Sequence, residues 1–276
     1  MRFHSDNKCI EMEIEPHFTF MPSNEKTYVG FDDKEMQEYL SKWGLRGNFF
    51  IQNFLFNGTF QEYHKYHMAD TFFKDDLVAK TLLSKQDNVW IRQGIRAMSV
   101  EVRQVPCSVL SMSFFDKLKN PDNDIIYNSG TICKRYDMQR EEFLISDNLR
   151  NMLLNEEAEE YNLYSEEERN EFLFRIFQIL VLGGTLCQFE DTLQPYLNVT
   201  KSIYKDLIRV QQQSNTNNLV VDTLVLEVIA KDHRGQEYFP SNSSHRQNVA
   251  FLLIHTKTRE ITTFVHQYGG YCNSVV

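Results

Sequence analysis

Two strongly apolar segments separated by a glycine pair dominate residues 171–210. The first, residues 172–182, would be apolar on nearly every side of a helix and is interrupted only by Arg175 and Gln178. A helix without a polar face is normally buried, and this one is shorter than the ~18 residues of a membrane span. It should end at Gly183, because glycine readily adopts the left-handed backbone that closes a helix. We therefore predict a central buried helix.

The segment after the glycine pair predicts an amphipathic helix. One face collects residues at intervals of three and four: Leu193, Tyr196, Leu197, Thr200, Ile203, Tyr204, Leu207 and Ile208. Pro195 is tolerated if it lies in the first turn, where its missing N–H costs little. A separate basic stripe at four-residue spacing consists of Lys201, Lys205 and Arg209. The stripe either complements the helix dipole and faces water or forms half of a partner contact.

Acidic residues precede these helices. Ser165 followed by Glu168 is typical of a capping box, which predicts a helix start. The acidic run itself comprises Glu156, Glu157, Glu159, Glu160, Glu166, Glu167, Glu168 and Glu171, with Arg169 as the one opposing charge. Such a run is usually a solvated surface, and the alternative is a docking face for a basic partner.

Strand patterns occur on both sides of this helical middle. Residues 49–56 are largely apolar, and in residues 95–105 apolar and polar side chains alternate as in a half-buried strand. Together with residues 88–92 and the turn at Gln93-Gly94, the second of these predicts a β-hairpin. The fold class is therefore α+β, with a helical middle and an N-terminal β-hairpin region.

A C-terminal antiparallel β-rich segment completes that prediction. Its three strand-like runs are residues 219–230, 249–256 and 260–267. We expect residues 1–30 to be an irregular extension and residues 31–276 to form a single globular α+β domain. This domain could be divided into two parts at the polar, uncharged loop 211–218. Whether the N- and C-terminal strands share one sheet is left open by the pattern.

Charge and cysteine content narrow the function. The chain carries 29 Lys and Arg against 38 Asp and Glu, a formal charge of −9. We therefore expect neither a nucleic-acid partner nor an anionic membrane surface. The five cysteines are odd in number and scattered, so neither a disulfide framework nor a zinc motif is predicted. The N-terminus has no secretory signal pattern, which makes the cytoplasm the expected compartment.

Few residues suggest catalysis. His64 and His67 are three apart and could share a metal on a helix, but spacing supplies no third ligand, so an aromatic patch is the preferred interpretation. Cys187 would be reactive at a helix N-terminus, but its apolar neighbours favour a small core residue. Cys107 is interpreted in the same way. The glycine pair at residues 183–184 lacks a phosphate-loop motif and is explained by a helix stop and a close helix–helix approach. No catalytic, cofactor-binding or metal site is predicted.

Several long blocks resemble the cilia- and flagella-associated protein 300 family. The longest is LGGTLCQFEDTLQPYLNVTKSIYKDLI at residues 182–208. Others are FFKDDLV at residues 72–78, VPCSVLSMSFFDKL at 105–118 and FLISDNLR at 143–150. Their order and spacing are similar to the family from about Phe31 to the C-terminus, whereas the first thirty residues show no resemblance.

The resemblance implies a process rather than a chemical site. Its family is associated with motile cilia and with assembly of axonemal dynein arms. The leading hypothesis is a non-enzymatic adaptor or assembly factor that binds axonemal dynein chains or the co-chaperone factors that mature them, in the cytoplasm and motile cilium. The alternatives are a structural component resident on the axoneme, and a divergent enzyme using His64, His67 or a cysteine. Candidate partner-binding residues are Glu156, Glu157, Glu159, Glu160, Lys201, Lys205 and Arg209.

Overall fold

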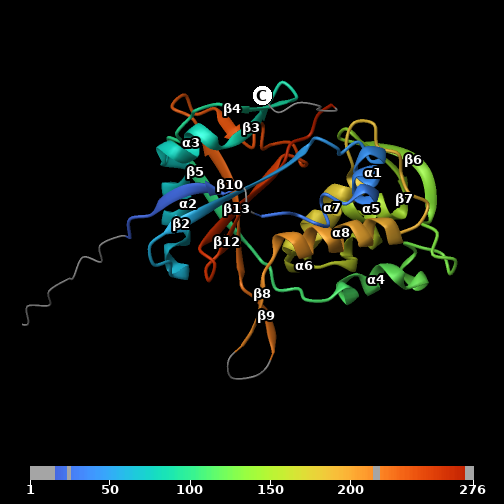
Figure 1. Cartoon of the computed structure of the whole chain (residues 1–276). Coiled ribbons are helices and arrows are strands. Elements are labelled where there is room, and N and C mark those ends of the chain that lie inside the picture. The colour runs from blue at the N-terminus through green and yellow to red at the C-terminus, as the bar shows by residue number, and fades with distance from the viewer. Residues whose placement is uncertain (1–15, 24–25, 214–217, 271–276) are drawn as a thin grey trace, which may run out of the picture.

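A central antiparallel sheet with helices on both faces organises the chain (Figure 1). The computed structural model describes residues 16–23, 26–213 and 218–270. The sheet has seven strands in the order β1-β2-β13-β12-β10-β11, with β5 also paired to β10. These strands are β1 (Thr19–Ser23), β2 (Phe49–Asn57), β5 (Ser99–Val105), β10 (Thr223–Lys231), β11 (Glu237–Phe239), β12 (Val249–His255) and β13 (Glu260–His266). The N- and C-terminal strands therefore belong to one sheet.

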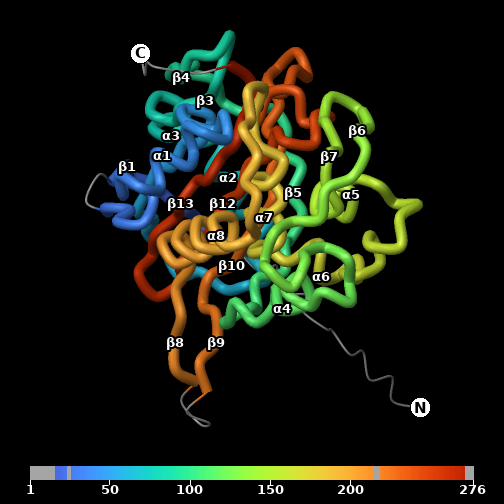
Figure 2. Tube along the Cα trace, turned by 90° about the vertical axis from the view of Figure 1, so that its right-hand side faces the viewer, coloured from blue at the N-terminus to red at the C-terminus, as the bar shows by residue number. Residues whose placement is uncertain are grey.

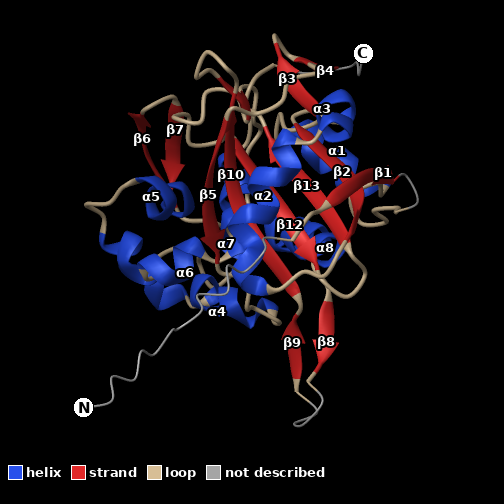
Figure 3. Cartoon of the chain, turned by 90° about the vertical axis from the view of Figure 1, so that its left-hand side faces the viewer, coloured by secondary structure: helices blue, strands red, loops and turns tan. Residues whose placement is uncertain are grey.

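The helices divide between the two faces (Figures 1 and 3). One face carries α1 (Lys34–Lys42), α4 (Asp116–Lys119), α5 (Asn148–Leu154), α6 (Glu166–Asn170), α7 (Phe172–Leu182) and α8 (Gln194–Leu207). The other carries α2 (Lys65–Lys74), α3 (Asp76–Thr81) and the two-stranded sheet of β3 (Leu83–Gln86) and β4 (Val89–Arg92). Short 3-10 helices cover Glu62–His64, Met112–Phe115, Pro121–Asn123 and Glu159–Leu163. The predicted α+β class with a helical middle is confirmed.

Burial on both faces explains why β12 shows no alternation of apolar and polar residues. All seven of its residues are buried. Phe251 and Leu253 belong to the core beneath α7 and α8, whereas Leu252 and Ile254 belong to the core beneath α2. Antiparallel sheets commonly leave one face in water and then alternate. Here both faces are covered, so the strand is continuously apolar.

The buried helix and the amphipathic helix are confirmed. In α7 nine of the eleven residues are buried, and α8 places Pro195 in its first turn and buries its apolar face. Gly183 closes α7 with a φ of +69°. A Cβ on Gly184 would lie 2.1 Å from the Gly44 carbonyl oxygen, so the close approach predicted between two helices is instead made against the loop after α1. Only a residue without a side chain permits that approach.

The capping box opens a separate short helix rather than α7. Ser165 and Glu168 make both of its hydrogen bonds, but they cap α6. The chain then turns extended at Glu171, with φ −56° and ψ 135°. The Glu171 carboxylate accepts a hydrogen bond from the Ser108 hydroxyl at 2.5 Å, and the Phe172 amide donates to the Pro106 carbonyl at 2.8 Å. Contacts with a distant segment thus replace the continuous helix that local sequence favours.

The predicted hairpin over residues 88–105 is wrong in its pairing. β4 pairs with β3, which precedes it, and β5 pairs with β10 near the other end of the chain. The β5–β10 register places Arg103 opposite Glu227, with a 2.5 Å ion pair between them. Alternation identifies a strand but not its partner, and the long-range partner offers both an apolar face and charge pairing.

The irregular extension predicted for residues 1–30 is wrong at Thr19–Ser23, whereas the described residues 26–30 belong to no helix or strand. Thr19–Ser23 is strand β1, paired antiparallel with β2 at the sheet edge. Phe18 and Phe20 are buried in the core beneath α2. Burial of these two aromatic side chains holds the segment against β2 as a strand, although the local sequence pattern does not predict one. Residues 1–15 lie outside the described part of the chain.

The polar stretch 211–218 begins in a strand, because Gln211 and Gln212 belong to a hairpin. Its flanks belong to β8 (Val210–Gln212) and β9 (Leu219–Val221), which pair antiparallel and project from the body of the protein (Figure 2). A further two-stranded sheet joins β6 (Lys134–Arg140) and β7 (Phe143–Asp147). Residues 214–217 lie outside the described residues.

Candidate functional site

Two of the three predicted basic residues border a groove beside α8. The groove has a volume of about 340 Å³ and is lined by Val109, Leu110, Ser111, Met112, Leu173, Lys201, Tyr204 and Lys205. We call it the α8 groove. Lys201 and Lys205 are exposed, and the four-residue spacing places both on the same side of the helix. Leu110 is 48% exposed, so the groove combines an accessible apolar surface with a basic rim.

Hydrogen bonds hold the floor of the α8 groove. The Tyr204 hydroxyl donates to the Val109 carbonyl oxygen at 2.9 Å and lies 3.5 Å from the Cys107 sulfur. Burial, reinforced by the neighbouring thiol, raises the pKa of Tyr204, so its hydroxyl stays protonated as a donor. The segment before Met112 is thereby fixed against α8.

Arg209 does not belong to this basic surface. The helix ends at Leu207, and Arg209 is half-buried beyond it. Its backbone amide donates to the Thr223 hydroxyl at 2.7 Å, and its guanidinium lies 3.9 Å from the Glu260 carboxylate. The predicted three-residue stripe is therefore reduced to two residues, because the chain turns into the sheet where a longer helix would have continued the stripe.

The acidic candidates form a second, separate surface. Glu156, Glu157 and Glu159 are exposed, whereas Glu160 is half-buried and accepts a hydrogen bond from Asn151 at 3.3 Å. A cleft of about 520 Å³ is lined by Asp122, Asn123, Asp124, Glu159, Glu160, Asn162 and Leu163. It shares no lining residue with the α8 groove. The two charged surfaces are thus distinct.

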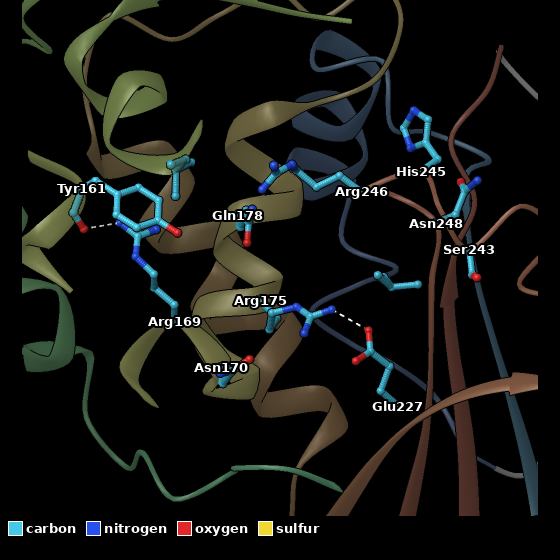
Figure 4. Close-up of a pocket in the computed structure, with 12 residues that line it drawn as sticks. Tyr161, Arg169, Asn170, Arg175, Gln178, Glu227, Ser243, His245, Arg246 and Asn248 are labelled. Carbon is cyan, nitrogen blue, oxygen red and sulfur yellow. Dashed lines mark hydrogen bonds and ion pairs between the residues drawn. The ribbon is translucent and has the colours of Figure 1, made fainter. Parts of the chain in front are cut away.

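A third cleft, absent from the sequence predictions, lies between the helices and the sheet (Figure 4). It has a volume of about 320 Å³ and is lined by Leu153, Tyr161, Arg169, Asn170, Arg175, Gln178, Glu227, Ser243, His245, Arg246, Asn248 and Val249. We call it the arginine cleft. Arg175 and Gln178, the two interruptions of the apolar α7 segment, were its signal in the sequence. The remaining residues come from α5, the 3-10 helix Glu159–Leu163, α6, β10, the segment before β12 and the first residue of β12, which local patterns cannot bring together.

Ion pairs fix part of the arginine cleft. The Arg175 guanidinium lies 2.6 Å from one Glu227 oxygen and that of Arg103 lies 2.5 Å from the other. Burial alone would raise the pKa of Glu227, but these two arginines outweigh it and the pKa is lowered. His245 stacks on Tyr268 with ring centroids 4.3 Å apart. Glu227 therefore stays ionised and holds Arg175 in place.

The histidine pair lies in an aromatic cluster. The rings of His64 and His67 pack on Phe18, with centroids 6.4 Å and 5.9 Å away. His67 Nε2 lies 3.0 Å from the Pro16 carbonyl oxygen. Within residues 16–23, 26–213 and 218–270, no group of three or more His, Cys, Asp or Glu could hold a metal ion.

The described thiols are embedded in the protein. Cys187 lies in the loop between α7 and α8, several residues before the helix N-terminus. Burial raises its pKa to about 11, against the opposing effect of Arg150. Burial likewise raises the pKa of Cys107 to about 12. Both are protonated at neutral pH, as expected of core residues. Cys9 and Cys272 lie outside the described residues.

Fold and clefts together define an α+β protein whose surface offers binding clefts of differing charge. The family model described as cilia- and flagella-associated protein 300 matches residues 17–266. The chain therefore belongs to the cilia- and flagella-associated protein 300 family, and it is a protein associated with cilia and flagella. The match begins before Phe31, so the expectation that the first thirty residues lack resemblance is wrong.

Two relatives support this membership along the whole chain. A cilia- and flagella-associated protein 300 of Paramecium tetraurelia is 30% identical over 268 residues, covering 97% of this chain and 98% of the relative. One of Chlamydomonas reinhardtii is 29% identical over 255 residues, covering 91% and 98%. No solved structure matches. In the described residues, no helix has the length and apolar character needed to cross a membrane.

Proposed function

We propose that this protein is a non-enzymatic adaptor or assembly factor for axonemal dynein arms. It acts in the cytoplasm and accompanies its cargo into the motile cilium. Its partners are axonemal dynein chains or the co-chaperone factors that mature them. Family membership supports the ciliary part of the proposal, and the α8 groove supports the adaptor part.

The α8 groove carries the proposal because its chemistry suits a protein segment. Leu110 and Met112 offer an apolar surface, and Lys201 and Lys205 stand beside it as cations. A short amphipathic segment with an apolar anchor and acidic flanks would match both features. The apolar contact would supply affinity, and the lysines would supply orientation and a faster encounter.

Support for a non-enzymatic role comes from the candidate nucleophiles and ligands. The rings of His64 and His67 pack on Phe18, and the Cys107 and Cys187 thiols are protonated at neutral pH. A thiol nucleophile needs a lowered pKa and an adjacent base. The described cysteines have the opposite environment.

The test is complementation of a deletion strain. Loss of the protein should leave cilia of normal length with dynein arms missing in electron micrographs and with impaired beating. The double variant Lys201→Glu/Lys205→Glu should fail to restore the arms. Lys34→Glu/Lys80→Glu, which changes net charge equally at two exposed lysines away from the groove, should restore them. Normal arms in the deletion strain would refute the proposal.

Extraction behaviour separates this function from residence on the axoneme. An assembly factor should be recovered mainly in the soluble fraction, with little left on salt-washed axonemes. A structural component would stay on the axoneme under the same wash. Quantitative immunoblotting of both fractions from cells expressing the tagged protein distinguishes the two.

A further inference from the structure

The arginine cleft carries more positive charge than its own carboxylate balances. Three guanidinium groups line it, from α6, α7 and the segment before β12, together with the single lining carboxylate of Glu227 (Figure 4). His245 also lines it, and its Nε2 lies 2.7 Å from the Glu142 carboxylate. That carboxylate is already shared between Arg175 and Arg103. Arg246 reaches Glu141 at 3.2 Å, with about a third of its side chain exposed. The cleft thus gathers three guanidinium groups on a protein with a formal charge of −9.

Arg169 is the lining guanidinium that no carboxylate contacts. Its guanidinium donates to the backbone carbonyl oxygens of Met152 at 2.9 Å and Tyr164 at 3.3 Å, and to that of Tyr161. These acceptors fix the group in space but are neutral. Within the described chain, no carboxylate oxygen lies within 4.0 Å of it. Stacking on the Tyr161 ring, 3.7 Å from the guanidinium carbon, holds it further.

Arg246 adds a second guanidinium to the same space. Burial has the largest effect on the pKa of Arg169 and lowers it, Tyr161, Glu156 and Tyr164 raise it, and Arg246 has the smallest effect and lowers it. An anion between Arg169 and Arg246 would be attracted by both guanidinium groups. Gln178 and Asn170 line the same space and offer neutral side-chain amides beside the cations.

Size and geometry narrow the class of anion. A volume of about 320 Å³ lies at the lower end of small-ligand sites. Guanidinium groups match the oxygens of phosphate with paired hydrogen bonds, and a dianion of about −1.5 to −2 charge suits several arginines better than one carboxylate does. We propose that the arginine cleft binds a phosphomonoester dianion, borne by a phosphorylated side chain of a partner protein or by a free small molecule.

The experiment measures binding to the purified full-length chain. The probes are inorganic phosphate, O-phosphoserine, a phosphoserine peptide and its unphosphorylated form, titrated by calorimetry at constant ionic strength in chloride. Saturable 1:1 binding of at least one phosphorylated probe is expected. Arg246→Gln should weaken it about tenfold, since a charge-assisted hydrogen bond is roughly of that size. Arg234→Gln, an equal charge loss at an exposed turn, should leave it unchanged.

A second variant guards against a folding artefact. Gln178→Glu keeps the side-chain size and places a negative charge in the cleft, so it should abolish binding while circular dichroism stays unchanged. Tighter binding of the phosphopeptide than of free O-phosphoserine assigns the ligand to a partner protein, and equal binding assigns it to a free compound. Absence of saturable binding, or equal weakening by Arg234→Gln, overturns the site. Because no dynein component is present, the result is independent of the proposed function.

Discussion

Arg150 is the buried charge that joins four parts of the helical layer, and its removal should be strongly destabilising. Its Nη1 lies 2.5 Å from the Asp147 carboxylate, and the two side chains are 1% and 0% exposed. Its Nη2 donates to the Val181 carbonyl at 2.8 Å and to the Tyr196 hydroxyl at 2.9 Å. The guanidinium carbon stacks 3.3 Å from the centroid of the Phe189 ring. One side chain thus connects α5, the end of α7, α8 and the loop between them.

The magnitude follows from what Arg150→Met leaves behind. The methionine keeps much of the volume, so the cavity contribution is small. The Asp147 carboxylate, however, stays fully buried without its cation, and removing one partner of a buried pair costs about 3–5 kcal/mol. Native domains have a total stability of about 5–15 kcal/mol. A chain of this length loses roughly 2 °C in melting temperature per kcal/mol, so we expect a fall of roughly 6–10 °C.

The assay is thermal and urea unfolding followed by circular dichroism at pH 7.5. The double variant Arg150→Met/Asp147→Asn removes the stranded charge but keeps an oxygen to cap α5, and should recover at least about 1 kcal/mol of the loss. The exposed control Arg92→Met should stay within about 0.5 kcal/mol of the parent. A loss below 1 kcal/mol for Arg150→Met, or a double variant no more stable than the single one, would refute this reasoning.

Three further predictions concern acid stability, close packing and thiol reactivity. Burial, followed by the charges of Lys26 and Arg209, lowers the pKa of His255 to about 3, below the ~6.5 of an unfolded chain. The neutral ring therefore contributes stability above pH 6.5 that is lost as the pH falls towards 3. His255→Gln should reduce the slope of the free energy of unfolding against pH, measured in urea between pH 6.5 and 4.5, by roughly 1.4 kcal/mol per pH unit. Gly184→Ala should cost about 3 kcal/mol or more in chemical unfolding, because its methyl group would meet a backbone oxygen. Burial raises the pKa of Cys187 to about 11, so at pH 8 iodoacetamide should modify it at least about tenfold more slowly in the folded chain than in guanidinium, as measured by peptide mass spectrometry.

Each of these has a contrary outcome. His233→Gln, at an exposed turn, is the control for the titration, and an equal effect of the two histidine variants would contradict the assignment to burial. Gly270→Ala meets its nearest atom only at 3.6 Å and should be nearly neutral, so similar losses for both glycine variants would exclude steric conflict as the cause. A Cys187 that reacts equally fast folded and unfolded would contradict its buried environment and revive a thiol-based activity.

Local pattern predicted the helical layer well because each signal there is complete within a few residues. Three features depend only on residues within about one or two helical turns. They are the apolar residues on all sides of α7, the start of α8 at Pro195 and the capping box at Ser165. The strand segments β2, β10, β12 and β13 were also recognisable from their apolar runs. Their grouping into one sheet was not, because pairing is decided by residues far apart along the chain.

The candidate surfaces divide in the same way. Lys201 and Lys205 share a helix face, so their spacing was enough to place them together. Arg209 was misplaced because the helix ends two residues earlier, where the chain enters hydrogen bonding with Thr223. The arginine cleft was missed altogether, since Arg175 and Arg246 lie 71 residues apart along the chain.

The amino-acid order alone determines which segments must be buried, that α7 ends at the glycine pair, and to which family the chain belongs. The partner of β5, the place of β1 at the sheet edge and the convergence of three arginines arise only when the sheet closes. The physical reason is that helical periodicity and capping depend on interactions between residues a few positions apart, so a short stretch of sequence is enough to predict them. Strand pairing and cleft electrostatics are sums over contacts between distant segments, so they are decided only in the folded chain.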